Sequence, residues 1–287
     1  MKKLEHKSQG IMKSSFIKTT FLGMGLFLAN AFCDGSVVFS DDFNTDSDGN
    51  LVGQNGWTQT GSTTTTPIQV SSGAVSVGGS GQDAYKALSS TVSAAAGTSF
   101  YVAADIVVTE THSADYFLHV VANGGDTSGF FDLLAVKGGT GSTFLFGIAP
   151  NTGATLAYGS TALSINTDYR IVLEYTFVNG GGAGSGNDQM TLYVNPTSSV
   201  EGNNSSYVTY TAANNGGTDP TSFGAINFRQ GSSGPVETVD NLTAGSNFND
   251  VVPVPELAAW GAISAAGLFS ICGIRIWRQQ RAPKIPV

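Results

Sequence analysis

The segment Tyr169-Arg-Ile-Val-Leu-Glu-Tyr-Thr-Phe177 shows the pattern that decides the fold class. Apolar or aromatic side chains occupy every second position, and polar residues such as Arg170 and Glu174 stand mostly between them. Since successive side chains of a strand point to opposite faces, the segment is predicted to be a β-strand with one buried face. Phe100-Tyr-Val-Ala-Ala-Asp-Ile-Val-Val108 has the same alternation, with Asp105 on the polar side.

Similar short runs recur along the chain, separated by clusters of Gly, Asn, Ser and Thr. The further strand-like runs are 36–40, 68–77, 115–122, 130–137, 143–149, 189–194, 206–211, 223–229 and 236–242. No run with helical periodicity stands between the N-terminal segment and residue 257. Many short strands with glycine-rich turns predict an all-β domain over residues 36–250, an antiparallel β-sandwich or jelly roll.

The charge of this domain argues against nucleic acid as a partner. Nine of the 13 basic side chains and three of the 21 acidic ones lie in the two ends of the chain. Residues 36–255 therefore keep four basic and 18 acidic side chains, a net charge of −14. Such a domain repels phosphate backbones. Both cysteines, Cys33 and Cys272, lie outside it, so we expect neither disulfides nor thiol chemistry there.

Residues 1–35 have the three parts of a secretory signal. Lysines precede the uncharged run 21–29, and Ala29-Asn30-Ala31 supplies small residues at a cleavage position. The apolar run is too short to span a hydrocarbon layer of about 30 Å. We therefore expect a signal helix that directs export.

Residues 251–287 have the pattern of a membrane-anchoring tail. Leu257 to Ile274 is a run of 18 residues without a charge, and Arg275, Arg278 and Arg281 follow it. This predicts one transmembrane helix over about 257–277, with the basic end on the cytoplasmic side and the acidic domain outside.

The residues before this helix add a family resemblance. Pro253 and Pro255-Glu256, then the single hydrophobic helix, then the basic tail resemble the PEP-CTERM sorting signal of Gram-negative bacteria. Leu257 stands where the usual motif has a second proline. The resemblance implies processing by an exosortase-type membrane protease and association with the cell surface or exopolysaccharide. The alternative is a tail that serves only as a membrane anchor.

Three segments resemble concanavalin A-like (laminin-G-like) domains of bacterial surface proteins. Phe39-Ser-Asp-Asp-Phe43 together with Gly53-Gln-Asn-Gly-Trp57 resembles the opening of such domains. Asp188-Gln-Met-Thr-Leu-Tyr-Val-Asn-Pro196 and Val236-Glu-Thr-Val-Asp-Asn-Leu-Thr-Ala-Gly245 are similar to a late strand and the closing strand. The resemblance implies a lectin- or glucanase-type sandwich, but fold alone does not assign a function.

No catalytic motif accompanies this resemblance. The domain lacks a Glu-x-Asp-x-x-Glu strand and a Gly-x-Ser-x-Gly elbow with its triad. We therefore expect no enzymatic activity. The alternative, a glycan hydrolase or lyase, would gain support if Asp41, Asp42, Asp132 or Glu174 clustered in one concave groove.

One loop has the oxygen spacing of a calcium site. Asn44, Asp46, Asp48 and Asn50 alternate with other residues, and Gly49 allows a sharp bend. The position that usually holds a bidentate glutamate is Asn55. The alternative is an Asp-Gly turn that joins two strands.

The remaining candidates have ordinary explanations. His112, His119 and Asp115 could bind a metal, but their spacing favours ordinary strand or surface residues. Trp57 could be a sugar platform, although a place in the core suits it better. The sequence identifies no glycan-binding residue.

These observations predict a non-enzymatic, exported protein of the cell surface or extracellular matrix, structural or glycan-binding, sorted or anchored by its C-terminal signal. A glycan hydrolase or lyase and a calcium-dependent glycan-binding module are the alternatives.

Overall fold

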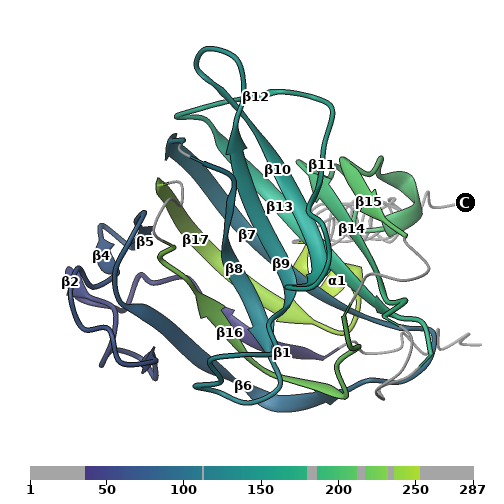
Figure 1. Cartoon of the computed structure of the whole chain (residues 1–287), viewed down its shortest axis with the longest axis horizontal. Helices are drawn as coiled ribbons and strands as arrows, with labels where there is room; N and C mark the ends of the chain where they lie inside the picture. The colour runs from purple at the N-terminus through teal and green to yellow at the C-terminus, as the bar shows by residue number, and fades with distance from the viewer. Residues whose placement is uncertain (1–35, 112, 180–185, 212–216, 232–235, 253–287) are drawn as a thin grey trace, which may run out of the picture. The chain divides into compact units, whose positions relative to one another are not determined.

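A computed structural model describes residues 36–252, except for residues 112, 180–185, 212–216 and 232–235. This part of the chain folds into two antiparallel β-sheets (Figure 1). The all-β antiparallel prediction is therefore confirmed. Residues 1–35 and 253–287 lie outside the described residues, and with them the predicted signal helix, the Pro-Glu motif and the predicted helix at 257–277.

The first sheet has the strand order β15-β14-β13-β7-β17-β5-β4-β2, and β1 also pairs with β17. Its strands are β1 (Val37–Asp41), β2 (Gly49–Asn50), β4 (Gln69–Ser71), β5 (Ala74–Val77), β7 (Thr98–Glu110), β13 (Asp168–Phe177), β14 (Gln189–Val194), β15 (Val208–Tyr210) and β17 (Val236–Gly245). We call this sheet A. The two long strands read from the sequence, β7 and β13, are neighbours in it.

The second sheet, sheet B, has the order β11-β10-β9-β8-β16-β6-β3, and β12 pairs with β10. Its strands are β3 (Thr58–Thr60), β6 (Asp83–Ser93), β8 (Asp115–Val121), β9 (Phe131–Gly138), β10 (Thr143–Asn151), β11 (Ala157–Tyr158), β12 (Leu163–Ser164) and β16 (Ser222–Phe228). Because the chain crosses repeatedly between the sheets, segments far apart in sequence become neighbours.

The two sheets pack face to face around one apolar core. Ile171, Leu173, Tyr175 and Phe177, the apolar face of β13, are buried in it, as the alternation predicts. The ring of Phe223 from sheet B lies 5.0 Å from the ring of Tyr175 in sheet A. Interdigitating side chains of two inner faces are the usual core of a β-sandwich.

A smaller apolar cluster covers part of the outer face of sheet A. The helix α1 (Phe248–Val251) contacts this face. The cluster consists of Tyr101, Ala103, Val172, Tyr193, Phe248, Val251 and Val252. Val172 explains why the second face of β13 is not wholly polar. Buried packing against the outer face of sheet A thus extends to Val252, the last residue that the structure describes.

The strand predictions differ from the structure at 68–77, at β6 and at the short strands β2, β3, β11 and β12, which were not predicted. The run 68–77 is a hairpin, because Ser72 and Gly73 have φ angles of 54° and 78° and form a tight turn between β4 and β5. β6 was not predicted at all. Its residues Lys86 and Ser90 interrupt the alternation, and its pairing with β16 contains an irregularity in register.

Helical structure is scarce in the described residues, which contain α1 and the short 3-10 helix η1 (Glu201–Asn203). Neither is long or apolar enough to cross a bilayer.

Candidate functional site

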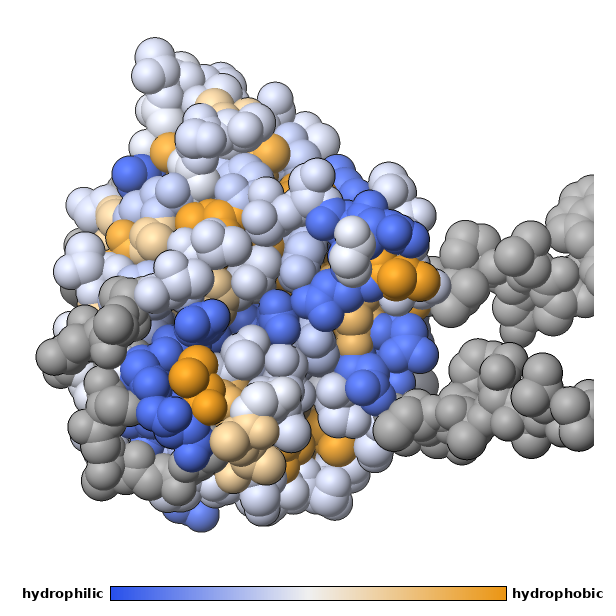
Figure 2. Space-filling model, turned by 90° about the vertical axis from the view of Figure 1, so that its right-hand side faces the viewer, coloured by the Kyte–Doolittle hydropathy of each residue, from blue (hydrophilic) through white to orange (hydrophobic). Residues whose placement is uncertain are grey.

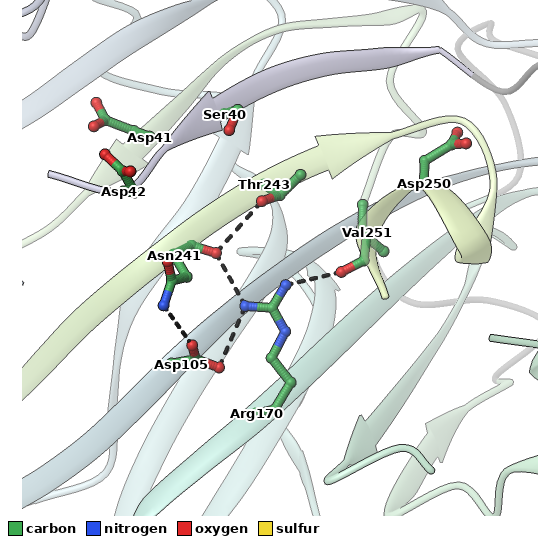
Figure 3. A pocket seen from close by; sticks show the side chains of 9 residues that line it. All are labelled: Ser40, Asp41, Asp42, Asp105, Arg170, Asn241, Thr243, Asp250 and Val251. Carbon is green, nitrogen blue, oxygen red and sulfur yellow. Dashed lines mark hydrogen bonds and ion pairs between the residues drawn. The ribbon is translucent and has the colours of Figure 1, made fainter. Parts of the chain in front are cut away.

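A polar pocket of about 510 Å³ lies on the outer face of sheet A (Figure 3). β1, β7, β13 and β17 contribute to its walls, and α1 closes one side. Its lining residues are Ser40, Asp41, Asp42, Asp105, Arg170, Asn241, Thr243, Asp250 and Val251. We call it the Arg170 pocket.

Arg170 holds three elements together at the centre of this pocket. Its Nη1 donates to Asp105 Oδ1 at 3.3 Å and to the Asn241 carbonyl at 3.0 Å, and its Nη2 donates to the Val251 carbonyl at 2.8 Å (Figure 3). Its Nε is buried and donates to no described group.

The register of three strands explains this convergence. Asp105 of β7 lies directly opposite Arg170 of β13 on one side and Asp240 of β17 on the other. β17 has a bulge after Asp240, and Asn241 there has a φ of 49°. The bulge lets Asn241 Nδ2 donate to Asp105 Oδ2 at 2.7 Å. Bulges commonly redirect a side chain in this way.

Asp41 lines the pocket, but its carboxylate already accepts hydrogen bonds from neighbouring residues of the protein. Its Oδ2 accepts from Trp57 Nε1 at 2.9 Å and from Lys86 Nζ at 2.7 Å, and its Oδ1 accepts from the Phe43 amide. Trp57 is 2% exposed and stacks on Phe228 at a ring distance of 5.0 Å. Trp57 is therefore a core residue, as predicted, and the alternative of a sugar platform is wrong.

A second depression continues the pocket along sheet A. Asp105 and Asn241 line both depressions, and the second adds Asp168 and Asp240. Partial burial raises the pKa of Asp240, and Asp105, Asp42 and Asp168 raise it further by repulsion. Burial and the neighbouring Asp105 likewise raise the pKa of Asp168. The two depressions are neighbours on sheet A, and acidic residues outnumber cationic ones among their lining residues.

The four acids named for a hydrolase do not meet in one groove. Asp41 and Asp42 line the Arg170 pocket. Asp132 is fully buried in β9 of the other sheet. Glu174 accepts hydrogen bonds from Ser99, Tyr101 and Thr176 elsewhere on sheet A and is not among the lining residues of the pocket.

Glu174 has an acidic neighbour that the sequence did not reveal. Tyr101 Oη donates to both Glu174 Oε1 at 3.3 Å and Glu201 Oε2 at 3.0 Å, and Tyr193 Oη donates to Glu201 Oε1 at 2.8 Å. Burial raises the pKa of Glu174, and Glu201 adds to the increase. The alternation of β13 placed Glu174 on the outer face, but nothing in the sequence brings η1 beside it.

The predicted calcium loop joins β1 to β2, and side-chain oxygens of Asp48 and Asn50 accept hydrogen bonds that close the turn. Asp48 Oδ1 accepts from the Ser72 amide, Asn50 Oδ1 accepts from Gln69 Nε2, and the Asn44 side chain packs against Gly73. Asp46 Oδ2 is buried without a partner. Within the described residues, no three acidic, histidine or cysteine side chains form a metal-binding group. Calcium therefore stays a prediction, and the turn alternative accounts for the observed contacts.

The histidine hypothesis gains no support from the geometry. His119 is buried, and its ring lies 4.3 Å from that of Phe130. Burial, with the Arg229 charge as a smaller cause, lowers the pKa of His119 to about 3. Asp115 pairs with Arg229 at 2.7 Å, and His112 lies outside the described residues.

The predicted sorting residues also lie outside the described part of the chain. They are Pro253, Pro255, Glu256, Arg275, Arg278 and Arg281.

Comparison with known proteins adds distant similarities in structure. No family model and no curated protein matches the sequence. The alginate lyase Aly36B is similar at 12% identity, over 72% of this chain and 95% of that one, with a TM-score of 0.44. The carbohydrate recognition domain of Emp46p in its potassium-bound form is similar at 10% identity, over 76% and 100%, with a TM-score of 0.43.

The carbohydrate-binding module CBM66 from Bacillus subtilis is similar at 16% identity, over 67% of this chain and 96% of that one, with a TM-score of 0.34. At these identities and scores, none of the three names assigns an activity to this chain.

Proposed function

We propose that this β-sandwich is a non-enzymatic glycan-binding domain, exported and held at the cell surface or in an extracellular polysaccharide matrix by the C-terminal signal. The Arg170 pocket is the observation that carries the proposal. It is large enough for sugar residues, and polar side chains converge in it.

The pocket has the chemistry that a polyol needs. A sugar presents hydroxyl groups that both donate and accept hydrogen bonds. Asp42 supplies an acceptor, and the hydroxyl groups of Ser40 and Thr243 can donate or accept. Arg170, Asp105 and Asn241 are held by hydrogen bonds to one another, so this part of the pocket wall is organised before a ligand arrives.

The exposed surface fits a hydrophilic ligand. Figure 2 shows one face of the molecule on which hydrophilic residues predominate and apolar residues form only small, separate patches. Among the described residues, the large hydrophobic side chains that are exposed are Val37 and Val200. Large apolar patches usually mark protein- or membrane-binding surfaces.

The test is glycan binding by the exported protein, kept in detergent if it retains its tail. Titration against the host's own exopolysaccharide and a glycan array should give saturable binding. Thr243→Tyr places a bulky side chain in the pocket wall and should weaken binding at least about tenfold. Thr209→Tyr, an exposed position on β15 of the same sheet, is the matched control and should bind like the native protein. Absence of binding, or equal binding by both variants, would count against the proposal.

A second candidate function rests on the pair Glu174 and Glu201. Glycoside hydrolysis commonly uses two carboxyl groups, one of which holds its proton above the usual pH range. The raised pKa of Glu174 beside Glu201 fits that requirement. If the protein is a hydrolase, it should release reducing ends from the host polysaccharide, and Glu174→Gln should abolish the release while Glu110→Gln should not. We expect no release from the native protein.

A further inference from the structure

We infer that Glu174 and Glu201 form a pH-dependent latch, which holds the connection between β14 and β15 against sheet A under acidic conditions and releases it as the pH rises. The inference goes beyond the proposed glycan binding, and its test requires no glycan. It rests on the geometry around two tyrosine hydroxyl groups, those of Tyr101 and Tyr193, on the outer face of sheet A.

The two carboxyl groups meet at one phenol. Tyr101 Oη lies 3.3 Å from Glu174 Oε1 and 3.0 Å from Glu201 Oε2, and a hydroxyl group has one proton to donate. Glu174 also forms a side-chain hydrogen bond with Glu201, which requires one of the two carboxyl groups to carry a proton. Two carboxyl groups this close are stable together when they share a proton, and they repel each other when both are ionised.

The helix η1, which carries Glu201, has little else to hold it on the sheet. None of its three residues is buried. The side-chain hydrogen bonds of Asn204, the residue after η1, go to residues 197–201 of the same connection. In the described part of the chain, the hydrogen bonds that join η1 to sheet A are those of Glu201 with Tyr101 and, at 2.8 Å, with Tyr193. The position of η1 therefore depends on the charge state of this cluster.

The groups around the acid pair include no cation to offset its repulsion. Burial raises the pKa of Glu174, and repulsion by Glu201 adds to the increase, while hydrogen bonds from Ser99 and Thr176 lower it. The other titratable groups that interact with Glu174 are the two tyrosines and, from β9 of sheet B, Asp132. Because the docked state binds the shared proton more tightly than the released state, docking weakens as the pH rises above the ordinary pKa of a glutamate.

The latch also contacts the helix that borders the Arg170 pocket. The rings of Tyr101 and Tyr193 pack edge-on against Phe248 of α1, at ring distances of 5.9 Å and 5.1 Å. The acid pair and the closed side of the pocket thus share these two tyrosines.

The test measures the mobility of η1 with a nitroxide spin label on the exported protein, kept in detergent if it retains its tail. Asn203→Cys places the label at an exposed position of η1, and Cys33→Ser and Cys272→Ser remove the other thiols. Electron paramagnetic resonance separates mobile from immobile label. We expect the ratio of mobile to immobile label to increase several-fold between about pH 5 and about pH 8, since one charge contact at a partly exposed site corresponds to a factor of a few.

Two variants of nearly unchanged shape identify the groups responsible. Glu201→Gln and Glu174→Gln each remove one negative charge and keep an oxygen that accepts from the tyrosine hydroxyl groups, so either should hold the label immobile at both pH values. Asp48→Asn, at an exposed position between β1 and β2, should show the full pH response. A label at Thr209→Cys, exposed on β15, should not respond to pH. Thermal unfolding verifies that each variant is folded.

The outcomes separate this inference from the proposed function. A label ratio at position 203 that is independent of pH would overturn the inference, and so would a pH response that persists in both glutamine variants. An equal response of the label at position 209 would show a general loosening of the sheet and would overturn it as well. Since these measurements contain no glycan, failure of glycan binding would contradict the proposed function alone.

Discussion

Asp132 occupies an unusual environment for a carboxylate. It is fully buried in β9, and neither carboxylate oxygen has a described hydrogen-bond partner. Its φ angle of 54° lies in the left-handed region, which asparagine and aspartate tolerate better than most residues. Burial raises the pKa of Asp132 well above its ordinary value, and the charge of Glu174 adds to the increase.

We predict that Asp132→Asn stabilises the fold at neutral pH. The folded state binds the Asp132 proton more tightly than the unfolded state, so this carboxyl destabilises the fold increasingly as the pH rises above its ordinary pKa of about 4. The gain should grow as the pH rises from about 4 towards neutral, because the unfolded state loses its proton over this range while the folded state keeps it. Denaturant unfolding at several pH values measures it.

The pH dependence identifies the cause. The gain should disappear well below pH 4, where the carboxyl is protonated in both the folded and the unfolded state. A gain that is independent of pH would contradict the argument. Asp48→Asn, at an exposed position, provides the baseline.

At the scale of elements, α1 depends on sheet A for its position. A helix of four residues has little stability of its own. Asn247 and Asp250 form a capping box, Arg170 binds the Val251 carbonyl, and Phe248 packs edge-on against Tyr193 at a ring distance of 5.1 Å. Because α1 closes one side of the Arg170 pocket, its docking and the shape of the pocket are linked.

We predict that Phe248→Ala costs about 3 kcal/mol of unfolding free energy, as for other buried aromatic residues. It should also weaken glycan binding, since it loosens α1. Val200→Ala, at a position that is 59% exposed, is the control and should change stability by less than about 0.5 kcal/mol. Chemical denaturation measures both, and an unchanged stability of Phe248→Ala would contradict the packing.

The loop from β1 to β2 gives a second prediction at this scale. Since Asp48 and Asn50 already bind Ser72 and Gln69, we expect saturating calcium to leave the melting temperature unchanged. Differential scanning calorimetry with calcium and with a chelator tests this. An increase with calcium that Asp46→Asn abolishes would instead support the calcium site, because a ligand that binds only the folded state stabilises it.

At the scale of the whole molecule, the acidic sandwich and the two ends have separate roles. We propose that the sandwich offers a pocket for a ligand and that the predicted signals in residues 1–35 and 251–287 determine where the protein is located. Removal of the tail would leave the domain without its arginine-rich end and with the net negative charge of residues 36–255.

We predict that the native protein, isolated from its host, ends near Pro255 and is found outside the cell. Intact mass spectrometry after cell fractionation measures both properties. A species that keeps Arg275 to Lys284 and stays in the membrane fraction would instead show that the tail is a membrane anchor only.

The sequence by itself determined most of the strand layout. Alternation in β7 and β13 was sufficient because a half-buried strand must place its apolar residues on one face. It failed for β6, where Lys86 lies in the middle of the strand and binds Asp41 instead of facing open solvent. It also failed for the turn inside 68–77, because a hairpin of two apolar strands resembles one longer run.

Only the tertiary structure decided the site. Arg170 lies 65 positions from Asp105, and Asn241 lies 136 positions from Asp105, so no local pattern could join them. Their meeting depends on the order of β13, β7 and β17 in sheet A and on a bulge at Asn241. Local alternation reports which face of a strand is buried, whereas strand order and register, which decide what meets on the other face, arise from packing across the whole chain.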